Sequence, residues 1–387
     1  MGVAPLQIAF SDADWAAIRA RVAGYEWHEM PDVPEGGDRW AYGTDMRTLR
    51  QICDHWVGGY DWQRLARRLG AWPNFTTEID GQAIHFLHIK SPAANATPLL
   101  LTHGWPGSVL EFLDVIGPLA ARCDLVIPSL PGYGLSGKPK TPIGPRATAA
   151  LWDRLMREEL GYASYIAQGG DWGAVVTGWL GARHGLAQGG GCRAIHLNMF
   201  ALRAPVPPQT PEEQAWAAEQ LATREREGAY LRLQMTKPQT LSYAMMDSPV
   251  GVAAWIVEKF HRWSDRRGAD GSDRLDNAFS TDDLLDNIML YLLTRSFNTA
   301  TWFYRGAMEE GTVLPAGSRV EVPTGVAVYP AELFKFPPRR LAEQSFNVVR
   351  WTELDHGGHF AAMETKAAFA AEVLGFVDQV AGTASAR

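Results

Sequence analysis

Short apolar runs that alternate with helical stretches restrict the possible folds of this chain more than any other feature. The runs lie at residues 99–102, 125–127, 165–167 and 195–197, and the pattern resumes at 326–328 and 348–350. Continuous apolar strands are typical of a sheet that is buried on both faces, and strands separated by helices pair in parallel. A terminal amphipathic helix is expected at about 366–380. The sequence therefore predicts an α/β fold with a mostly parallel sheet and helices on both faces.

Two segments lie outside this alternation, one before it and one within it. The first reads as helices, with Ser11 as an N-cap, followed by a hairpin whose strands, 75–79 and 84–89, flank an Asp80-Gly81 turn. The second is helical and rich in Trp, Tyr and Met, with an acidic, glycine-bearing loop near 266–280. We therefore expect four parts: an N-terminal extension at 1–92, the first part of the core at 93–200, a helical cap at 201–311 and the second part of the core at 312–387.

Composition excludes several classes of protein. Of the 387 residues, 46% are hydrophobic and 20% charged, which is typical of a globular protein, and the net charge of −7 without a long basic run argues against nucleic-acid binding. No apolar run approaches the ~18 residues of a membrane span, and the N-terminus lacks a secretory signal pattern. We expect a soluble cytoplasmic protein. Cys53, Cys123 and Cys192 form no CxxC pair, so we expect buried reduced thiols rather than a zinc site or a disulfide.

The segment at residues 165–174 carries the strongest chemical signal. It reads as a strand, a tight turn and a helix that we expect to begin near Gly173. Gly169 and Gly173 flank Asp171 at the spacing of the α/β-hydrolase nucleophile elbow, whose usual centre is Ser. A carboxylate at that position attacks a tetrahedral carbon and forms an alkyl ester, which suits epoxides and alkyl halides. Taken alone, the motif fits equally well an Asp171 that caps the following helix.

The loop after the first core strand has the sequence His103-Gly104-Trp105-Pro106. This fold places one oxyanion donor in that loop and the second on the residue after the nucleophile. We therefore assign the backbone N–H groups of Trp105 and Trp172 to an oxyanion hole. Pro106 would fix the loop but has no N–H to donate. We interpret His103 as structural.

The catalytic base is expected in the loop after the last strand, where His356 and His359 flank two glycines. We favour His359, because the glycines would let it reach the carboxyl edge of the sheet, and keep His356 as the alternative. Glu332 lies just past the strand at 326–328 and is the expected orienting acid, with Asp355 as its competitor. The chain order of nucleophile, acid and base is that of the fold.

The sequence resembles a known family, the microsomal-type epoxide hydrolases, which include the insect juvenile hormone hydrolases. The resemblance spans nearly the whole chain, and the segment Trp72-Pro73-Asn74-Phe75 resembles that family's N-terminal extension. The membrane-anchored members begin with an apolar helix that this sequence lacks, so we expect no membrane anchor. The motifs that carry the resemblance are His103-Gly104-Trp105-Pro106, Gly169-Gly170-Asp171-Trp172-Gly173, Tyr329-Pro330-Ala331-Glu332 and Asp355-His356-Gly357-Gly358-His359-Phe360.

The resemblance also implies two cap tyrosines that hold the epoxide oxygen, and these correspond to Tyr230 and Tyr304. Ring opening creates an alkoxide, and a phenol can donate to it without repelling the carboxylate. Trp302, Phe303 and Tyr291 lie close to Tyr304 in the sequence and leave that assignment open to rivals.

The sequence thus predicts an epoxide hydrolase in which Asp171 opens the ring and His359, oriented by Glu332, activates the water that hydrolyses the ester. We expect no metal or organic cofactor. The Trp and Met content of the cap suggests an apolar or aromatic small-molecule epoxide, either in detoxification or in secondary metabolism. Two alternatives remain open: a haloalkane or haloacid dehalogenase with the same Asp nucleophile, and a non-catalytic ligand-binding hydrolase fold.

Overall fold

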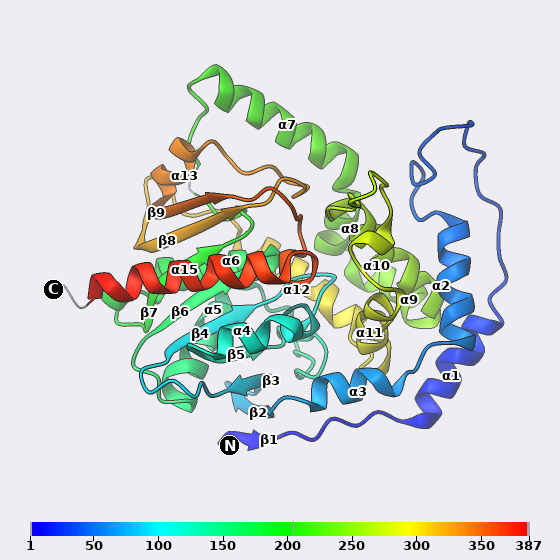
Figure 1. Cartoon of the computed structure of the whole chain (residues 1–387), viewed down its shortest axis with the longest axis horizontal. Helices are drawn as coiled ribbons and strands as arrows, with labels where there is room; N and C mark the ends of the chain where they lie inside the picture. Colours follow the sequence, from blue (N-terminus) through cyan, green and yellow to red (C-terminus); the bar gives the residue numbers. More distant parts are fainter. Residues whose placement is uncertain (1, 204, 385–387) are drawn as a thin grey trace.

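The computed structural model describes residues 2–203 and 205–384, and within them nine strands form one sheet (Figure 1). Their spatial order is β1-β2-β3-β5-β4-β6-β7-β8-β9. The pairs β1–β2, β2–β3 and β3–β5 are antiparallel, and all pairs from β5 onward to β9 are parallel. The strands are β1 (Ala4–Pro5), β2 (Asn74–Ile79), β3 (Gln82–Ile89), β4 (Thr97–Thr102), β5 (Cys123–Pro128), β6 (Tyr165–Gly169), β7 (Cys192–Leu197), β8 (Val320–Val328) and β9 (Phe346–Glu353).

Every strand expected from an apolar run lies inside one of these strands. In β5 and β6 all residues are buried, as expected for strands that helices cover on both faces. The structure lengthens β8 and β9 beyond the predicted 326–328 and 348–350. Several of their added residues are partly exposed, so they do not form the continuous apolar run on which the prediction relied.

Helices cover both faces of the sheet. Figure 1 shows α15 in front of the strands, where it packs on β7 and β8, while α6 packs on β6, β7 and β8 from behind. The α-helices are α1 (Asp12–Ala23), α2 (Met46–Gly58), α3 (Gln63–Gly70), α4 (Ile116–Ala120), α5 (Pro145–Arg154), α6 (Asp171–Arg183), α7 (Pro211–Glu227), α8 (Ala229–Thr236), α9 (Pro238–Asp247), α10 (Pro249–Trp263), α11 (Thr281–Leu293), α12 (Phe297–Glu310), α13 (Arg339–Ser345), α14 (Ala361–Glu364) and α15 (Lys366–Ala384). Shorter helical segments are η1 (Val109–Val115), η2 (Leu155–Glu159), η3 (Leu186–Gln188) and η4 (Leu275–Asn277).

The N-terminal segment begins as its sequence predicts. The Ser11 side chain accepts the backbone N–H of Asp14 and caps α1. Asp80 and Gly81 have φ angles of 52° and 76°, the pair of positive values that a tight two-residue hairpin turn requires. Figure 1 shows α1 and α2 lying against the cap helices, where they contact α10 and α11, rather than against the sheet. The helices α1 and α2 therefore lie against α10 and α11, while the strands β1, β2 and β3 of the same segment extend the sheet.

A charged cluster joins the extension to the cap. Asp286 on α11 is fully buried and accepts hydrogen bonds from Tyr60 at 2.8 Å and from Arg68 at 3.0 Å. Arg64 also pairs with Asp286, and with Asp283 at 2.7 Å. A buried carboxylate needs such partners, because an unpaired charge in the interior is strongly destabilising.

The helices α7 to α12 follow β7 and precede β8 in the chain, and they lie in the segment that was expected to form the cap. Two cap side chains hold the loop after β4: Asn287 donates to the Pro106 carbonyl and Tyr291 to the Gly107 carbonyl, each at 2.7 Å. The cap is therefore hydrogen-bonded directly to the loop that was expected to form the oxyanion hole.

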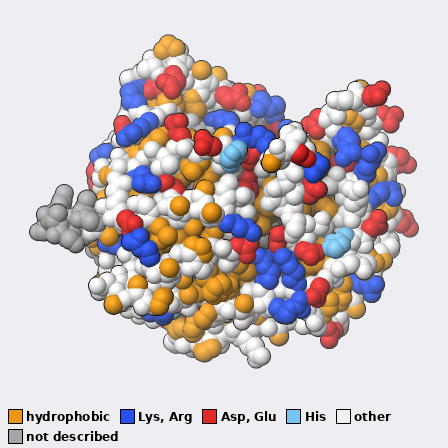
Figure 2. Space-filling view, viewed as in Figure 1, with side chains coloured by type: hydrophobic (Ala, Val, Ile, Leu, Met, Phe, Trp, Pro, Cys, Tyr) orange, Lys and Arg blue, Asp and Glu red, His pale blue; other side chains and the backbone are white. Residues whose placement is uncertain are grey.

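The surface and the thiols fit the composition. On the face shown in Figure 2, basic and acidic side chains are interspersed without a continuous basic surface. None of the described helices combines the length and the apolarity that a membrane span needs. Cys53, Cys123 and Cys192 are buried and free, as expected.

Candidate active site

Asp171 stands at the sharp turn between β6 and α6. Its φ of 48° lies in the left-handed region that side chains rarely adopt, which is typical of a nucleophile elbow. Gly173 must be glycine, because a Cβ there would lie 1.9 Å from the Thr102 carbonyl oxygen. The helix begins at Asp171, two residues before the expected start near Gly173. Gly170 is the N-cap residue, so Asp171 is not the helix cap.

The loop after β4 holds one oxygen of this carboxylate. The Trp105 backbone N–H donates to Oδ1 of Asp171 at 2.8 Å, and a Cβ on Gly104 would lie 2.2 Å from the same oxygen. Glycine is therefore needed for the loop to approach so closely. The Trp172 N–H, the second expected donor, lies in the first turn of α6, and its indole packs 4.8 Å from the ring of Tyr304.

His359 and Glu332 lie on the other side of Asp171. His359 Nε2 is 3.3 Å from Oδ2 of Asp171, and Nδ1 is 3.0 Å and 3.1 Å from the two carboxylate oxygens of Glu332. Burial lowers the pKa of His359, but the charges of Glu332 and Asp171 outweigh burial and hold that pKa well above its usual range. The side chain of Glu332 is fully buried, whereas that of Asp171 is 16% exposed.

The rival residues lie elsewhere. Asp355 and His356 are exposed on the loop before His359. His103 is buried, with Nδ1 2.9 Å from the Gly104 carbonyl and Nε2 accepting the Leu130 N–H at 3.1 Å. Burial lowers the pKa of His103 to about 4, which fits a neutral ring that holds the loop together.

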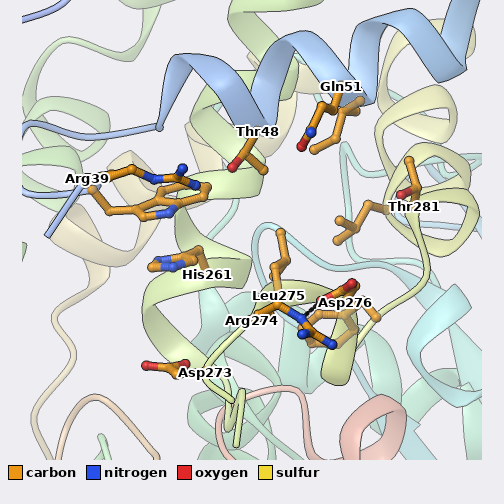
Figure 3. Close-up of a pocket in the computed structure, with 13 residues that line it drawn as sticks. Arg39, Thr48, Gln51, His261, Asp273, Arg274, Leu275, Asp276 and Thr281 are labelled. Carbon is orange, nitrogen blue, oxygen red and sulfur yellow. Dashed lines mark hydrogen bonds and ion pairs between the residues drawn. The ribbon is translucent and has the colours of Figure 1, made fainter. Parts of the chain in front are cut away.

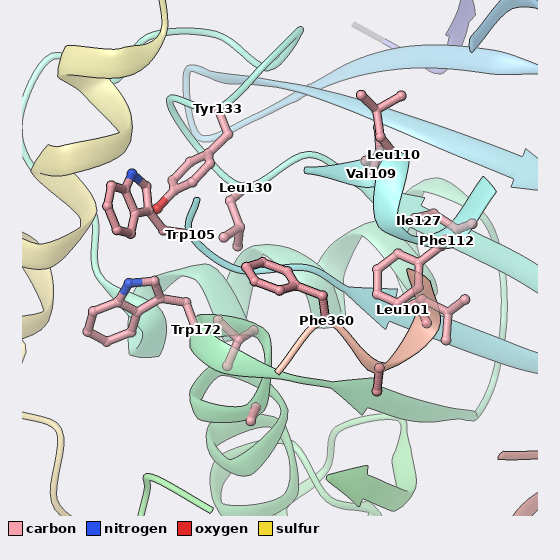
Figure 4. Close-up of a cluster of buried hydrophobic side chains, with 14 of the residues drawn as sticks. Leu101, Trp105, Val109, Leu110, Phe112, Ile127, Leu130, Tyr133, Trp172 and Phe360 are labelled. Atoms are coloured by element: carbon pink, nitrogen blue, oxygen red, sulfur yellow. The ribbon is translucent and has the colours of Figure 1, made fainter. Parts of the chain in front are cut away.

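The two cap tyrosines meet above the elbow. Tyr230 on α8 and Tyr304 on α12 are buried, and their ring centroids are 6.1 Å apart. Trp105 contacts both rings, stacking on Tyr230 at 5.4 Å and meeting Tyr304 edge-on at 5.7 Å. Figure 4 shows Trp105 and Trp172 at the edge of the buried core, beside the cap helix. Tyr291 instead donates to the Gly107 carbonyl, so its hydroxyl is already engaged.

Three nearby residues did not emerge from the sequence. The carbonyl of Trp263, at the end of α10, accepts the His359 backbone N–H at 2.8 Å, so the cap helps to hold the histidine loop. Lys259, on the same helix, is buried beside Tyr230.

Glu111, the third of these residues, follows Ser108 in an S-x-x-E pattern that is typical of a helix N-terminus. A Cβ on Gly107 would lie 1.6 Å from a carboxyl oxygen of Glu111, so the Glu111 side chain folds back against the loop after β4. Burial raises the pKa of Glu111 to about 8, against the opposing charge of His359. An acid inside the apolar run of η1 was the signal that could have revealed it. The backbone contact between Trp263 and His359 had no such signal, because it depends on the packing of the cap.

A separate hollow of about 310 Å³ lies between α2 and the loop that follows α10. Figure 3 shows Thr48 and Gln51 on one wall and Arg274 and Asp276 on the other. Arg274 is paired with Asp276 at 3.0 Å, and none of the residues proposed for chemistry lines this hollow. We therefore place the candidate site at Asp171 and not here.

Comparisons with known proteins find relatives that match most of the chain. Residues 3–112 match the family described as "Epoxide hydrolase N terminus", and residues 97–234 match "alpha/beta hydrolase fold". A putative epoxide hydrolase of Stigmatella aurantiaca is 40% identical, covering 96% of this chain and 84% of its own length. Epoxide hydrolase 1 of Oryctolagus cuniculus is 31% identical, covering 90% and 83%. The crystal structure of juvenile hormone epoxide hydrolase from Bombyx mori superposes with a TM-score of 0.85 at 29% identity, covering 98% of this chain and 94% of that one.

Proposed function

Since this chain belongs to the epoxide hydrolase family, we propose that it converts an epoxide to a vicinal diol through an alkyl ester on Asp171. The observation that carries the proposal is the setting of the Asp171 carboxylate. One of its oxygens accepts the Trp105 N–H at 2.8 Å, and the other faces His359, which in turn pairs with the Glu332 carboxylate. This arrangement combines a nucleophile, an oxyanion donor and an oriented base at one point.

In the first step, Oδ2 of Asp171 attacks an epoxide carbon while Oδ1 stays in the oxyanion hole. The carbon–oxygen bond of the ring breaks, and the departing oxygen takes a proton from one phenol, Tyr230 or Tyr304, while the other donates a hydrogen bond. The support for this step is the position of both phenols on the cap, across from the elbow and in contact with Trp105. A buried phenol is suited to the task because it donates without carrying charge.

In the second step, water attacks the ester. Esterification removes the negative charge of Asp171, which is one of the charges that raise the pKa of His359. The pKa of His359 therefore falls, and the imidazolium gives its proton to the tyrosinate that the first step left, which restores the phenol. Neutral His359 then takes a proton from water as that water attacks the carbonyl carbon. The N–H groups of Trp105 and Trp172 hold the oxyanion of the tetrahedral intermediate. Its bond to the alkyl oxygen then breaks, the proton of the newly added hydroxyl passes to that oxygen, and the diol leaves, which restores the Asp171 carboxylate and the imidazolium.

Isotope labelling tests the covalent step. After a single turnover in heavy-oxygen water, the diol should carry the original oxygen of Asp171, and mass spectrometry of the peptide containing Asp171 should find the label in its carboxylate. Asp171→Asn is the matched control, which should form no ester. Label that enters the diol directly during the first turnover would mean that water attacks the epoxide without an ester, and would refute the proposal.

The two tyrosines separate this reaction from dehalogenation, the alternative that uses the same nucleophile. A halide leaves without needing a proton, so Tyr230→Phe combined with Tyr304→Phe should abolish epoxide opening and leave attack on an alkyl halide largely intact. Equal loss with both substrates would argue against a role for the phenols in protonation.

The rings around the site favour an apolar or aromatic substrate. Trp105, Trp172, Trp263 and Phe303 contact the two tyrosines or each other. Styrene oxide should therefore have a higher kcat/KM than glycidol, a small polar epoxide, because its aryl ring can pack against these aromatic side chains. We further propose that the chain divides into the extension at 1–92, the core at 93–200 and 312–387, and the cap at 201–311.

A further inference from the structure

Lys259 is a buried cation beside one of the two phenols. It lies on α10 of the cap and is 7% exposed. Its ammonium is 4.4 Å from the ring centroid of Tyr230 and 5.7 Å from that of Trp263. Glu258, the preceding residue, forms an ion pair with it. The positive charge is thus enclosed in the cap against the face of a tyrosine that lines the site.

The two tyrosines consequently have different surroundings. Tyr230 has the ammonium over its ring and Trp105 stacked on it, whereas the ring of Tyr304 meets Trp105 and Trp172 edge-on. Burial and the charge of Asp171 raise the pKa of Tyr230 well above its usual range, and the neighbouring Tyr304 hydroxyl opposes that rise. A phenol that gives up a proton becomes an anion, and a cation at this distance attracts the anion much more strongly than the neutral ring.

We propose that Lys259 is a positioning residue that makes Tyr230 the proton donor in ring opening and leaves Tyr304 to donate a hydrogen bond. The epoxide oxygen takes the Tyr230 proton as its bond to carbon breaks, and the tyrosinate that remains is stabilised by the ammonium beside it. This inference rests on the proposed mechanism and deepens it. It also explains why a lysine occupies a buried position, where an apolar side chain would pack at lower cost.

Glu258 makes a structural role distinguishable from this electrostatic one. If the ion pair only held α10 in place, removing either partner would have the same effect. If the ammonium stabilises a tyrosinate, removing Glu258 should instead strengthen its influence, because the competing carboxylate is gone.

The test measures the alkylation step with styrene oxide by rapid quench and intact-protein mass, at a fixed neutral pH. Lys259→Met should slow ester formation about tenfold, which corresponds to ~1.4 kcal/mol, and leave ester hydrolysis unchanged. Lys259→Arg should retain most of the alkylation rate, because it keeps the cation. Glu258→Gln should leave it unchanged or raise it. If Lys259→Met does not fold, as judged by circular dichroism and thermal melting, Lys259→Gln serves in its place.

A double-mutant cycle with Tyr230→Phe completes the experiment. In the Tyr230→Phe background, Lys259→Met should cause no further loss of alkylation rate, because no tyrosinate can form at position 230. Equal slowing by Lys259→Met and Glu258→Gln, or additive losses in the cycle, would overturn the inference. If Tyr230→Phe itself leaves alkylation within twofold of the wild type, the proposed role of Tyr230 fails, and this outcome is distinct from a failure of Lys259 alone.

Discussion

Glu332→Gln isolates the part of the site that only the second half-reaction needs. The Glu332 side chain is fully buried and both of its oxygens lie within 3.1 Å of His359 Nδ1. Glutamine keeps the shape and can still accept from Nδ1, so the change removes the charge alone. A hydrogen bond to a charged group contributes about 1.5–3 kcal/mol, against about 0.5–1.5 kcal/mol for a neutral one, so losing the charge removes about 1–2 kcal/mol. It also lowers the pKa of His359 and weakens the base. That free energy corresponds to a factor of about 5–30 in rate.

The loss should fall on ester hydrolysis. We expect kcat to fall about 5- to 30-fold while the alkylation rate changes little, because Glu332 acts through His359, whose task as a base belongs to ester hydrolysis. Rapid quench with mass detection should find the ester accumulating in the steady state. Asp355→Asn is the matched control: this acid is exposed, so its replacement should leave both steps unchanged. If Glu332→Gln slows alkylation as much as hydrolysis, or leaves kcat within threefold of the wild type, the assignment of Glu332 is wrong.

Three further changes test the packing around the site. Glu111→Gln removes a carboxyl whose pKa is about 8 in the folded protein, against 4.5 ordinarily, so between these values the folded protein binds a proton that the unfolded chain lacks. The stability of the wild type therefore falls as the pH rises through that window, and the variant should gain stability relative to the wild type from pH 5 to 8 in urea unfolding. Arg64→Ala weakens the pairing of buried Asp286 and should lower the free energy of unfolding in urea by about 2–4 kcal/mol. Arg67→Ala breaks an exposed ion pair and should lower it by less than about 1 kcal/mol, so equal losses would contradict this account. Gly173→Ala should abolish turnover and lower the melting temperature sharply, because the new Cβ meets a backbone carbonyl; an active, stable variant would show that the elbow can relax.

The sequence alone predicted the elements whose signal is local. The apolar runs at 125–127 and 165–167 are strands in which every residue is buried, so their composition reveals their place in the sheet. Asp80-Gly81 predicted the hairpin, since few residue pairs tolerate two positive φ angles. Asp171 was found in the same way, because the spacing of Gly169 and Gly173 marks a turn that requires a close approach of strand and helix.

Only the tertiary structure decided which distant groups meet Asp171. The sequence left His356 as an alternative to His359, because two histidines on one loop differ only in the direction that their side chains face. It left Asp355 as an alternative to Glu332, because each is an acid that follows a strand of the core. The fold turns His359 inward onto Glu332 and leaves the other two in solvent. No sequence pattern indicated that Lys259 lies over Tyr230, because that contact joins two cap helices whose packing angle no local pattern determines. Asp171 could therefore be located from its own segment, whereas its surroundings required the folded chain.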